Sequence, residues 1–138
     1  MGLYLCVFDA SGEEIEGVDV GSYEDFNVFR KAVAATLEKG GMGEICPVLN
    51  THSDSDGEWT PEDAKGLLLE LDRIQEALRQ YPPVQLNSEW KRQVFQAEGL
   101  KRQTLLDSFF DIDGELLVER LRDLAKASVA SNQPILFQ

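Results

Sequence analysis

The sequence has few of the residues on which catalysis, metal binding and disulfide cross-links depend. Its 138 residues include one histidine and two cysteines. Nucleophilic catalysis needs a base, and metal sites are built largely from histidine, cysteine and clustered carboxylates. These low counts argue against both kinds of chemistry, and we expect no cofactor. Because disulfides are rare in a reducing cytosol, Cys6 and Cys46 are expected to be two buried free thiols.

Long apolar runs are also missing. No stretch approaches the roughly 20 apolar residues that a membrane-spanning helix requires. The apolar start, MGLYLCVFD, is too short for a signal peptide and has no basic residue ahead of it. These absences predict a cytoplasmic protein that has no membrane partner.

Basic residues are scarce and unevenly placed. The chain has 13 Lys and Arg against 25 Asp and Glu, a formal net charge of −12, and residues 1–29 hold seven carboxylates without a single Lys or Arg. Residues 40–64 and 103–119 are likewise acidic and contain no Lys or Arg. Phosphate binding needs concentrated Lys and Arg, which argues against nucleic acid as a partner. Two interpretations stay open: acidity for solubility alone, or an acidic face that attracts a basic protein.

The chain has enough apolar surface for one folded core. Hydrophobic residues make up 43% of it, including seven Phe. A length of 138 residues suits a single domain spanning residues 1–138, because one core can serve that length without splitting.

Periodicity and capping residues predict an α+β fold. Its small antiparallel or mixed sheet would combine an N-terminal hairpin with a C-terminal strand, packed with about four helices. Strands are predicted at residues 3–9, 13–20, 45–50 and 134–138, with a bulge at Gly17. Helices are predicted from the Ser22 cap to Gly40, from the Thr60 cap to about Gln80, over residues 87–97, and from 116 to about 129.

The densest polar cluster is HSDSDGEW, residues 52–59. His52, Asp54 and Asp56 alternate, so an extended backbone would place them on one face, within reach of a common metal or proton. The segment matches a calcium loop only in part, because His52 stands where that loop requires Asp. We therefore favour a turn that leads into the next helix, with Trp59 packing just before the Thr60 cap. A small metal-dependent enzyme or cation-binding protein using His52, Asp54 and Asp56 is the alternative.

A second turn of the same kind, DIDG, lies at residues 111–114. Asp113 is expected to cap the helix that follows. If this turn lies beside residues 54–56 in space, Asp54, Asp56, Asp111 and Asp113 would form one acidic cluster that could attract a cation.

Several short segments together resemble a known family. These segments are GLYLCVFD, VGSYEDF, HSDSDGEW, NSEW, SFFDIDGE and PILFQ, in this order along nearly the whole chain. Their set resembles a family of bacterial immunity proteins associated with polymorphic toxin systems, the family numbered seventy.

The resemblance implies a small cytosolic antidote that binds a cognate toxin and is not an enzyme. The resemblance implies this role for the chain and identifies no catalytic residues. Many such toxins are nucleases with basic clefts, which would suit an acidic partner. We expect a monomer or homodimer in which the partner-binding residues are Asp54, Asp56, Glu58, Trp59, Asp111 and Asp113. If exposed, Trp59 or Tyr81 would serve as an aromatic anchor.

Overall fold

A computed structural model describes residues 2–37, 47–51, 57–83, 86, 89–101 and 103–138. Its sheet contains β1 (Gly2–Phe8), β2 (Glu14–Ser22), β3 (Glu58–Trp59) and β4 (Ile135–Phe137) in the order β2-β1-β4-β3. All neighbouring strands are antiparallel. The predicted α+β class, the N-terminal hairpin and the C-terminal strand are confirmed.

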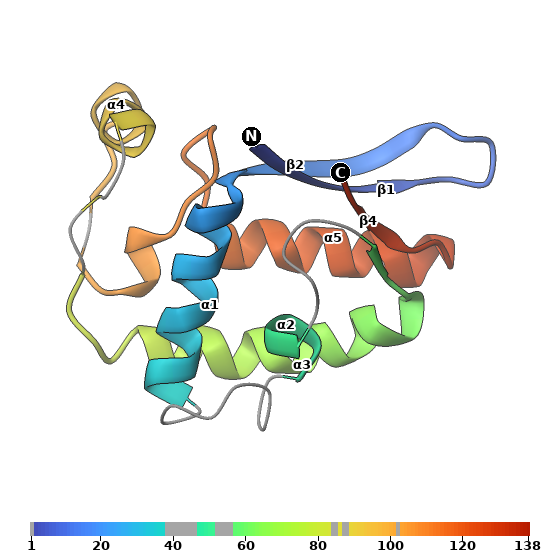
Figure 1. The fold of residues 1–138 in the computed structure, drawn as a ribbon, viewed down its shortest axis with the longest axis horizontal. Helices are drawn as coiled ribbons and strands as arrows, with labels where there is room; N and C mark the ends of the chain where they lie inside the picture. Colours follow the sequence, from blue (N-terminus) through green and yellow to red (C-terminus); the bar gives the residue numbers. More distant parts are fainter. Residues whose placement is uncertain (1, 38–46, 52–56, 84–85, 87–88, 102) are drawn as a thin grey trace.

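The helices are α1 (Tyr23–Leu37), α2 (Pro47–Thr51), α3 (Pro61–Leu78), α4 (Glu89–Ala97) and α5 (Leu117–Ser131), with a short 3-10 turn at Leu106–Ser108. Helix α5 packs against the hairpin strands and against α3, which runs beside it in the opposite direction (Figure 1). Helix α1 crosses these two helices, and α4 stands at the end of the molecule away from the hairpin turn (Figure 1). Apolar stripes of α1, α3 and α5 meet the inner face of the sheet in one core.

The strand predicted at residues 45–50 is wrong where the structure describes it, because residues 47–51 form the short helix α2. The reason is a contact from another helix. The buried carboxylate of Glu70 on α3 accepts hydrogen bonds from the backbone N–H groups of Val48 and Leu49, at 3.0 Å each. These first-turn N–H groups have no partner within a helix, and an acceptor there stabilises helical geometry. The strand that the sheet has in addition to the hairpin and the C-terminal strand is instead β3, Glu58–Trp59.

The predicted bulge at Gly17 is also misplaced. The ladder runs through Gly17, which pairs with Cys6, and the register shifts at Ile15, between the Val7–Glu16 and Phe8–Glu14 pairs. Glycine is needed at position 17 for a different reason: a Cβ atom there would lie 2.7 Å from Cζ of the Tyr4 ring, which is too close unless the ring moves. The bulge leaves Ile15 44% exposed.

The helix caps predicted at Ser22 and Thr60 are confirmed. Ser22 and Asp25 exchange side-chain to backbone hydrogen bonds at the start of α1, and Thr60 and Asp63 do so at the start of α3. Asp113 does not cap α5, whose N-cap residue is Leu116 with no side-chain hydrogen bond.

Cys6 is buried, as predicted, and burial raises the pKa of its thiol, with the nearby Glu14 carboxylate adding to the shift. A thiol held protonated is a poor nucleophile. Cys46 lies outside the described residues.

Candidate partner-binding surface

The structure separates the residues singled out from the sequence. His52, Asp54 and Asp56 lie outside the described residues. Trp59 is 1% exposed, and its indole N–H donates to the carbonyl of Val48 at 3.0 Å. Trp59 therefore belongs to the core and offers no aromatic surface to a partner.

Asp111 is also buried, at 1% exposure, and its carboxylate is fully engaged. One oxygen accepts from the backbone N–H groups of Asp113 and Glu115, at 2.9 and 3.0 Å. The other accepts from Nε of Arg120 at 3.2 Å. Asp111 thus closes the turn before α5. Of the two aspartates in the DIDG turn, Asp111 and Asp113, only Asp113 is exposed.

The most projecting acidic element is the β1–β2 hairpin (Figure 1). We call it the acidic hairpin, defined by the side chains of Asp9, Glu13, Glu14, Glu16 and Asp19. The Asp9 carboxylate accepts three hydrogen bonds, from the backbone N–H and hydroxyl of Ser11 and the N–H of Glu13. The bond from the Ser11 hydroxyl, followed by the backbone bonds, lowers the pKa of Asp9. The turn therefore keeps a fixed negative charge at its start.

Along the strands, the Tyr4 hydroxyl donates to the Glu14 carboxylate at 2.9 Å. Burial, together with this bond and the negative charge of Glu14, raises the pKa of Tyr4 to about 12. Tyr4 therefore stays a donor at neutral pH and holds Glu14 along the hairpin.

Few cations compensate this charge. Among the described residues, two basic side chains reach carboxylates of the segment 2–29: Arg120 contacts Glu16 at 3.1 Å, and Lys91 contacts Asp25 at 3.4 Å. Within the same part of the chain, no Lys or Arg nitrogen lies within 4 Å of the hairpin carboxylates of Asp9, Glu13, Glu14 or Asp19. The hairpin thus carries negative charge that no Lys or Arg of the described residues compensates, in a position open to a partner.

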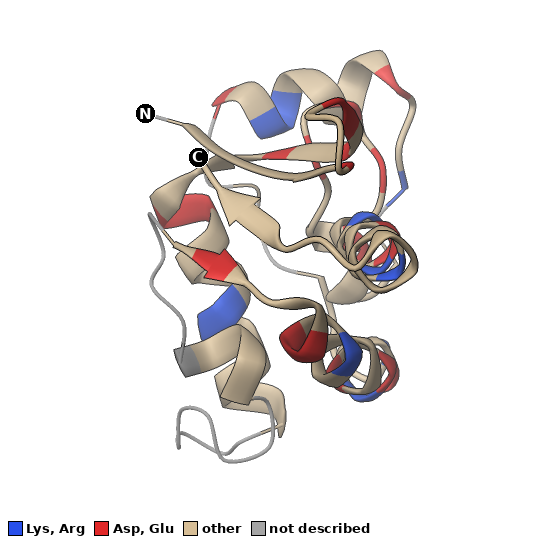
Figure 2. Cartoon of the chain, turned by 90° about the vertical axis from the view of Figure 1, so that its right-hand side faces the viewer, with Lys and Arg blue, Asp and Glu red and all other residues tan. Residues whose placement is uncertain are grey.

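Strand topology brings a second acidic segment to the same end of the molecule. Strands β1 and β3 both run antiparallel to β4, so they run in the same direction and end on the same side. The hairpin turn follows β1, and the start of α3 with the exposed Glu62 follows β3. Figure 2, which faces this end, shows acidic residues on the hairpin and at the start of α3. We call this region, including Glu58, the acidic end.

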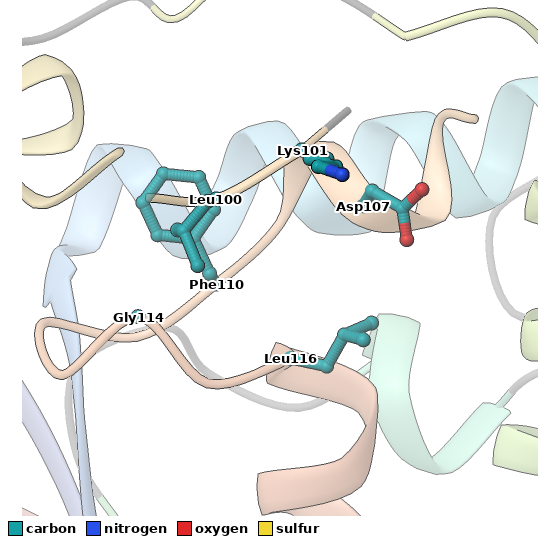
Figure 3. A pocket seen from close by; sticks show the side chains of 6 residues that line it. All are labelled: Leu100, Lys101, Asp107, Phe110, Gly114 and Leu116. Carbon is teal, nitrogen blue, oxygen red and sulfur yellow. The ribbon is translucent and has the colours of Figure 1, made fainter. Parts of the chain in front are cut away.

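A pocket beside the turn that precedes α5 is too small for substrate chemistry (Figure 3). Its volume is about 70 Å³, and it is lined by Leu100, Lys101, Asp107, Phe110, Gly114 and Leu116. Sites for small molecules usually enclose roughly 300 to 1,000 Å³. The Asp107 carboxylate already accepts from the backbone N–H groups of Gln103 and Thr104, at 3.1 and 3.2 Å. Its role is to shape the loop.

Metal-ligand geometry is not found in the part of the chain that the structure describes, where no three His, Cys, Asp or Glu side chains are grouped as a metal site requires. In the same residues, no helix is long and apolar enough to span a membrane.

A sequence model of immunity protein 70 (Imm70) matches residues 3–137, nearly the whole chain. The chain belongs to the Imm70 family. Membership implies a protein of a polymorphic toxin system that neutralises a cognate toxin, and such immunity proteins are typically not enzymes. No curated protein and no solved structure matches this Imm70 chain.

The residues that build the hairpin surface of this Imm70 protein were only partly visible in its sequence. The absence of Lys and Arg from residues 1–29 signalled the acidic segment, yet the sequence alone pointed to the turns before helices as the binding site. The exposure of Ile15 and the contact of Arg120 with Glu16 depend on strand register and on packing across the molecule.

Proposed function

We propose that this Imm70 protein neutralises a toxin domain with a basic surface, and that the acidic hairpin is the main contact. The observation that carries the proposal is the set of hairpin carboxylates that no described cation compensates. Uncompensated charge of one sign steers a partner of opposite charge and raises the association rate. Family membership supplies the toxin as the partner.

Ile15 gives the hairpin an apolar contact point. It is 44% exposed and lies between Glu14 and Glu16 in the strand that carries the bulge. Interfaces gain most of their affinity from a few apolar or aromatic anchors that a polar rim surrounds. A toxin surface with an apolar pocket inside a basic rim would fit this arrangement.

The acidic end extends the proposed surface beyond the hairpin. Glu58 and Glu62 are exposed there. Asp54 and Asp56 lie outside the described residues and remain candidates on the sequence alone. Trp59 and Asp111 are left out, since both are buried. Asp113 lies in the turn whose Ile112 N–H donates to the carbonyl of Asp19, toward the other end of the hairpin, so it is also left out.

A nuclease is the class of toxin that this charge fits best. Nucleases bind phosphates with concentrated Lys and Arg. An acidic hairpin would compete with the nucleic acid for these Lys and Arg side chains of the toxin. A standard neutralising interface buries roughly 1,600 Å², which is more than the hairpin turn alone would cover and calls for contacts along the acidic end.

Co-expression with the toxin domain encoded beside this gene tests the proposal. We expect the wild-type chain to restore growth, and the double variant Glu13→Lys/Glu14→Lys to lose most of that protection. Glu76→Lys/Glu89→Lys is the matched control, because it makes the same charge change at exposed sites near the end of α3 and at the start of α4. Figure 1 shows that both of these helix ends lie away from the acidic end. Loss of protection by the control alone, or by neither variant, would reject the acidic hairpin as the binding surface. Absence of protection by the wild-type chain would reject the proposed function.

A further inference from the structure

One largely buried arginine joins the acidic hairpin to the body of the protein. Arg120, in the first turns of α5, donates through Nε to Asp111 at 3.2 Å and contacts Glu16 at 3.1 Å. Its remaining nitrogen donates to the carbonyl of Gly17. A single guanidinium therefore links α5, the 111–115 turn and strand β2.

The contact with Gly17 is made at the outer edge of the sheet. Strand β2 is an edge strand, so β1 is its only strand neighbour among the described residues. On its other side, the Gly17 carbonyl accepts from Arg120 and the Asp19 carbonyl accepts from the Ile112 N–H at 3.4 Å. These two hydrogen bonds use backbone carbonyls with which a further strand could otherwise pair. They hold the middle of β2 on the side away from β1.

The anchor for Arg120 is rigid. The Asp111 carboxylate is held by two backbone N–H groups of its own turn, and a bridge between Phe110 and Leu116, the N-cap residue of α5, closes that turn. Burial alone would lower the pKa of Arg120, but the negative charges of Glu16, Asp111 and Glu115 outweigh it and raise the pKa. Arg120 is thus a cation at neutral pH that carboxylates contact from both sides, and hydrogen bonds between charged groups are roughly twice as strong as those between neutral groups.

We propose that Arg120 is the positioning residue of the toxin-binding surface: it holds the acidic hairpin in one orientation, so that the carboxylates meet the toxin already ordered. This inference rests on the proposed function. A binding element that samples several orientations binds more weakly in proportion to the fraction of time that it spends in the competent one. Arg120 would therefore contribute to affinity without touching the toxin.

The test variant is Arg120→Met/Asp111→Asn. It removes the cation and its buried partner together, so the net charge and every hairpin carboxylate stay as in the wild type. The amide side chain introduced by Asp111→Asn still offers an oxygen to the N–H groups of Asp113 and Glu115, and replacing a buried pair by neutral groups of similar volume avoids an isolated buried charge. A milder variant, Glu16→Gln, weakens the hairpin end of the contact. Its matched control, Glu13→Gln, removes one carboxylate that has no described cation partner.

Two measurements separate positioning from general stability. Hydrogen exchange of the free protein should be at least about tenfold faster at the amides of residues 14–18 in the double variant, because β2 loses the bonds from Arg120 to Glu16 and to the Gly17 carbonyl, and one charged hydrogen bond alone accounts for roughly that factor. Amides of α3 should exchange as in the wild type. Affinity for the toxin domain encoded beside this gene should fall by a similar factor. The salt dependence of association should be at least as strong as in the wild type, because every hairpin carboxylate is kept and Glu16 loses its cation partner.

The outcomes distinguish this inference from the proposed function. If Glu13→Lys/Glu14→Lys weakens binding but Arg120→Met/Asp111→Asn binds as tightly as the wild type, the positioning role is overturned and the function stands. If the wild-type chain does not bind that toxin domain, the proposed function falls, and exchange at residues 14–18 still decides whether Arg120 orders the hairpin. Equal exchange in Glu16→Gln and Glu13→Gln would also count against the positioning role.

Discussion

At the scale of single residues, burial decides how much an ion pair contributes to the stability of the fold. Lys91 and Asp25 lie 3.4 Å apart with 6% of each side chain exposed, whereas Lys65 and Glu62 lie 3.3 Å apart with more than half of each side chain exposed. Removing one member of a buried pair leaves a charge that water cannot reach. Removing one member of an exposed pair costs little, because water and salt already screen it.

The first prediction compares two lysine substitutions of the same chemistry. Lys91→Met should lower the free energy of unfolding by about 3 kcal/mol, and Lys65→Met by less than about 1 kcal/mol. Urea denaturation at pH 7 measures both. Similar losses in the two variants would show that the Lys91–Asp25 contact does not hold α4 against α1.

The Asp25 carboxyl also predicts a pH dependence. Burial alone would raise its pKa, but hydrogen bonds from the Ser22 backbone, the Trp90 indole and the Ser22 hydroxyl, with the charge of Lys91, outweigh burial and lower the pKa. Because the folded pKa lies below the unfolded one, the stabilisation is complete above roughly pH 4 and is lost as the pH falls through the folded pKa. Asp25→Asn should therefore be less stable than the wild type at pH 7, and the difference should shrink below pH 4.

Urea titrations of both proteins from pH 7 to pH 2, followed by tryptophan fluorescence, measure this difference. A gap in unfolding free energy that stays constant over the range would show that ionisation of Asp25 does not stabilise the fold.

Residue roles were predictable where the partner is near in sequence. Ser22 with Asp25 and Thr60 with Asp63 bond over three residues, and the capping pattern identified both pairs. Arg120 and Glu16 are 104 residues apart, and no local pattern could pair them.

At the scale of elements, one glycine sets how closely α1, α4 and β2 approach one another. Gly21 has φ +95, and a Cβ there would lie 2.6 Å from Oδ2 of Asp25 and 2.7 Å from Cζ2 of Trp90. Gly12, in the hairpin turn, has a similar φ of +90 with no atom within 4 Å of its Cβ position. The two sites share backbone strain and differ in packing.

Alanine at these two glycines separates strain from packing. Gly12→Ala should cost roughly 1 to 2 kcal/mol for the left-handed backbone, and Gly21→Ala roughly 1 to 3 kcal/mol more, because overpacking displaces the Trp90 ring. Thermal or urea unfolding gives both values, and Trp90 fluorescence should shift in Gly21→Ala alone. Equal costs would mean that α4 does not pack tightly against Gly21.

Elements were predictable where the chain itself carries the pattern. Helices α1, α3 and α5 have apolar stripes and the hairpin has alternating strands, so each was found within a few residues of its observed bounds. Helix α2 was mistaken for a strand because Glu70, on a distant part of the chain, satisfies its first N–H groups. The two-residue β3 exists because β4 pairs with it, and two residues carry no periodicity.

At the scale of the whole molecule, the fold brings together acidic residues that lie far apart in the sequence. The sequence showed that residues 1–29 lack Lys and Arg, and the resemblance of its short segments correctly indicated the Imm70 family. It could not show that β1 and β3 end on the same side, which places the hairpin turn and the start of α3 together. For the same reason it could not separate the exposed Asp9 turn from the buried Asp111.

The rate at which the toxin domain associates with this protein, measured by stopped flow over a range of salt concentrations, tests the central claim most directly. We predict that Glu13→Lys/Glu14→Lys associates at least about tenfold more slowly than the wild type at low salt, with a weaker dependence on ionic strength. The matched Glu76→Lys/Glu89→Lys variant should associate nearly as fast as the wild type. Equal rates for the hairpin variant and the wild type at low salt, or an equal slowing in both variants, would contradict the claim that the acidic hairpin meets a basic toxin surface.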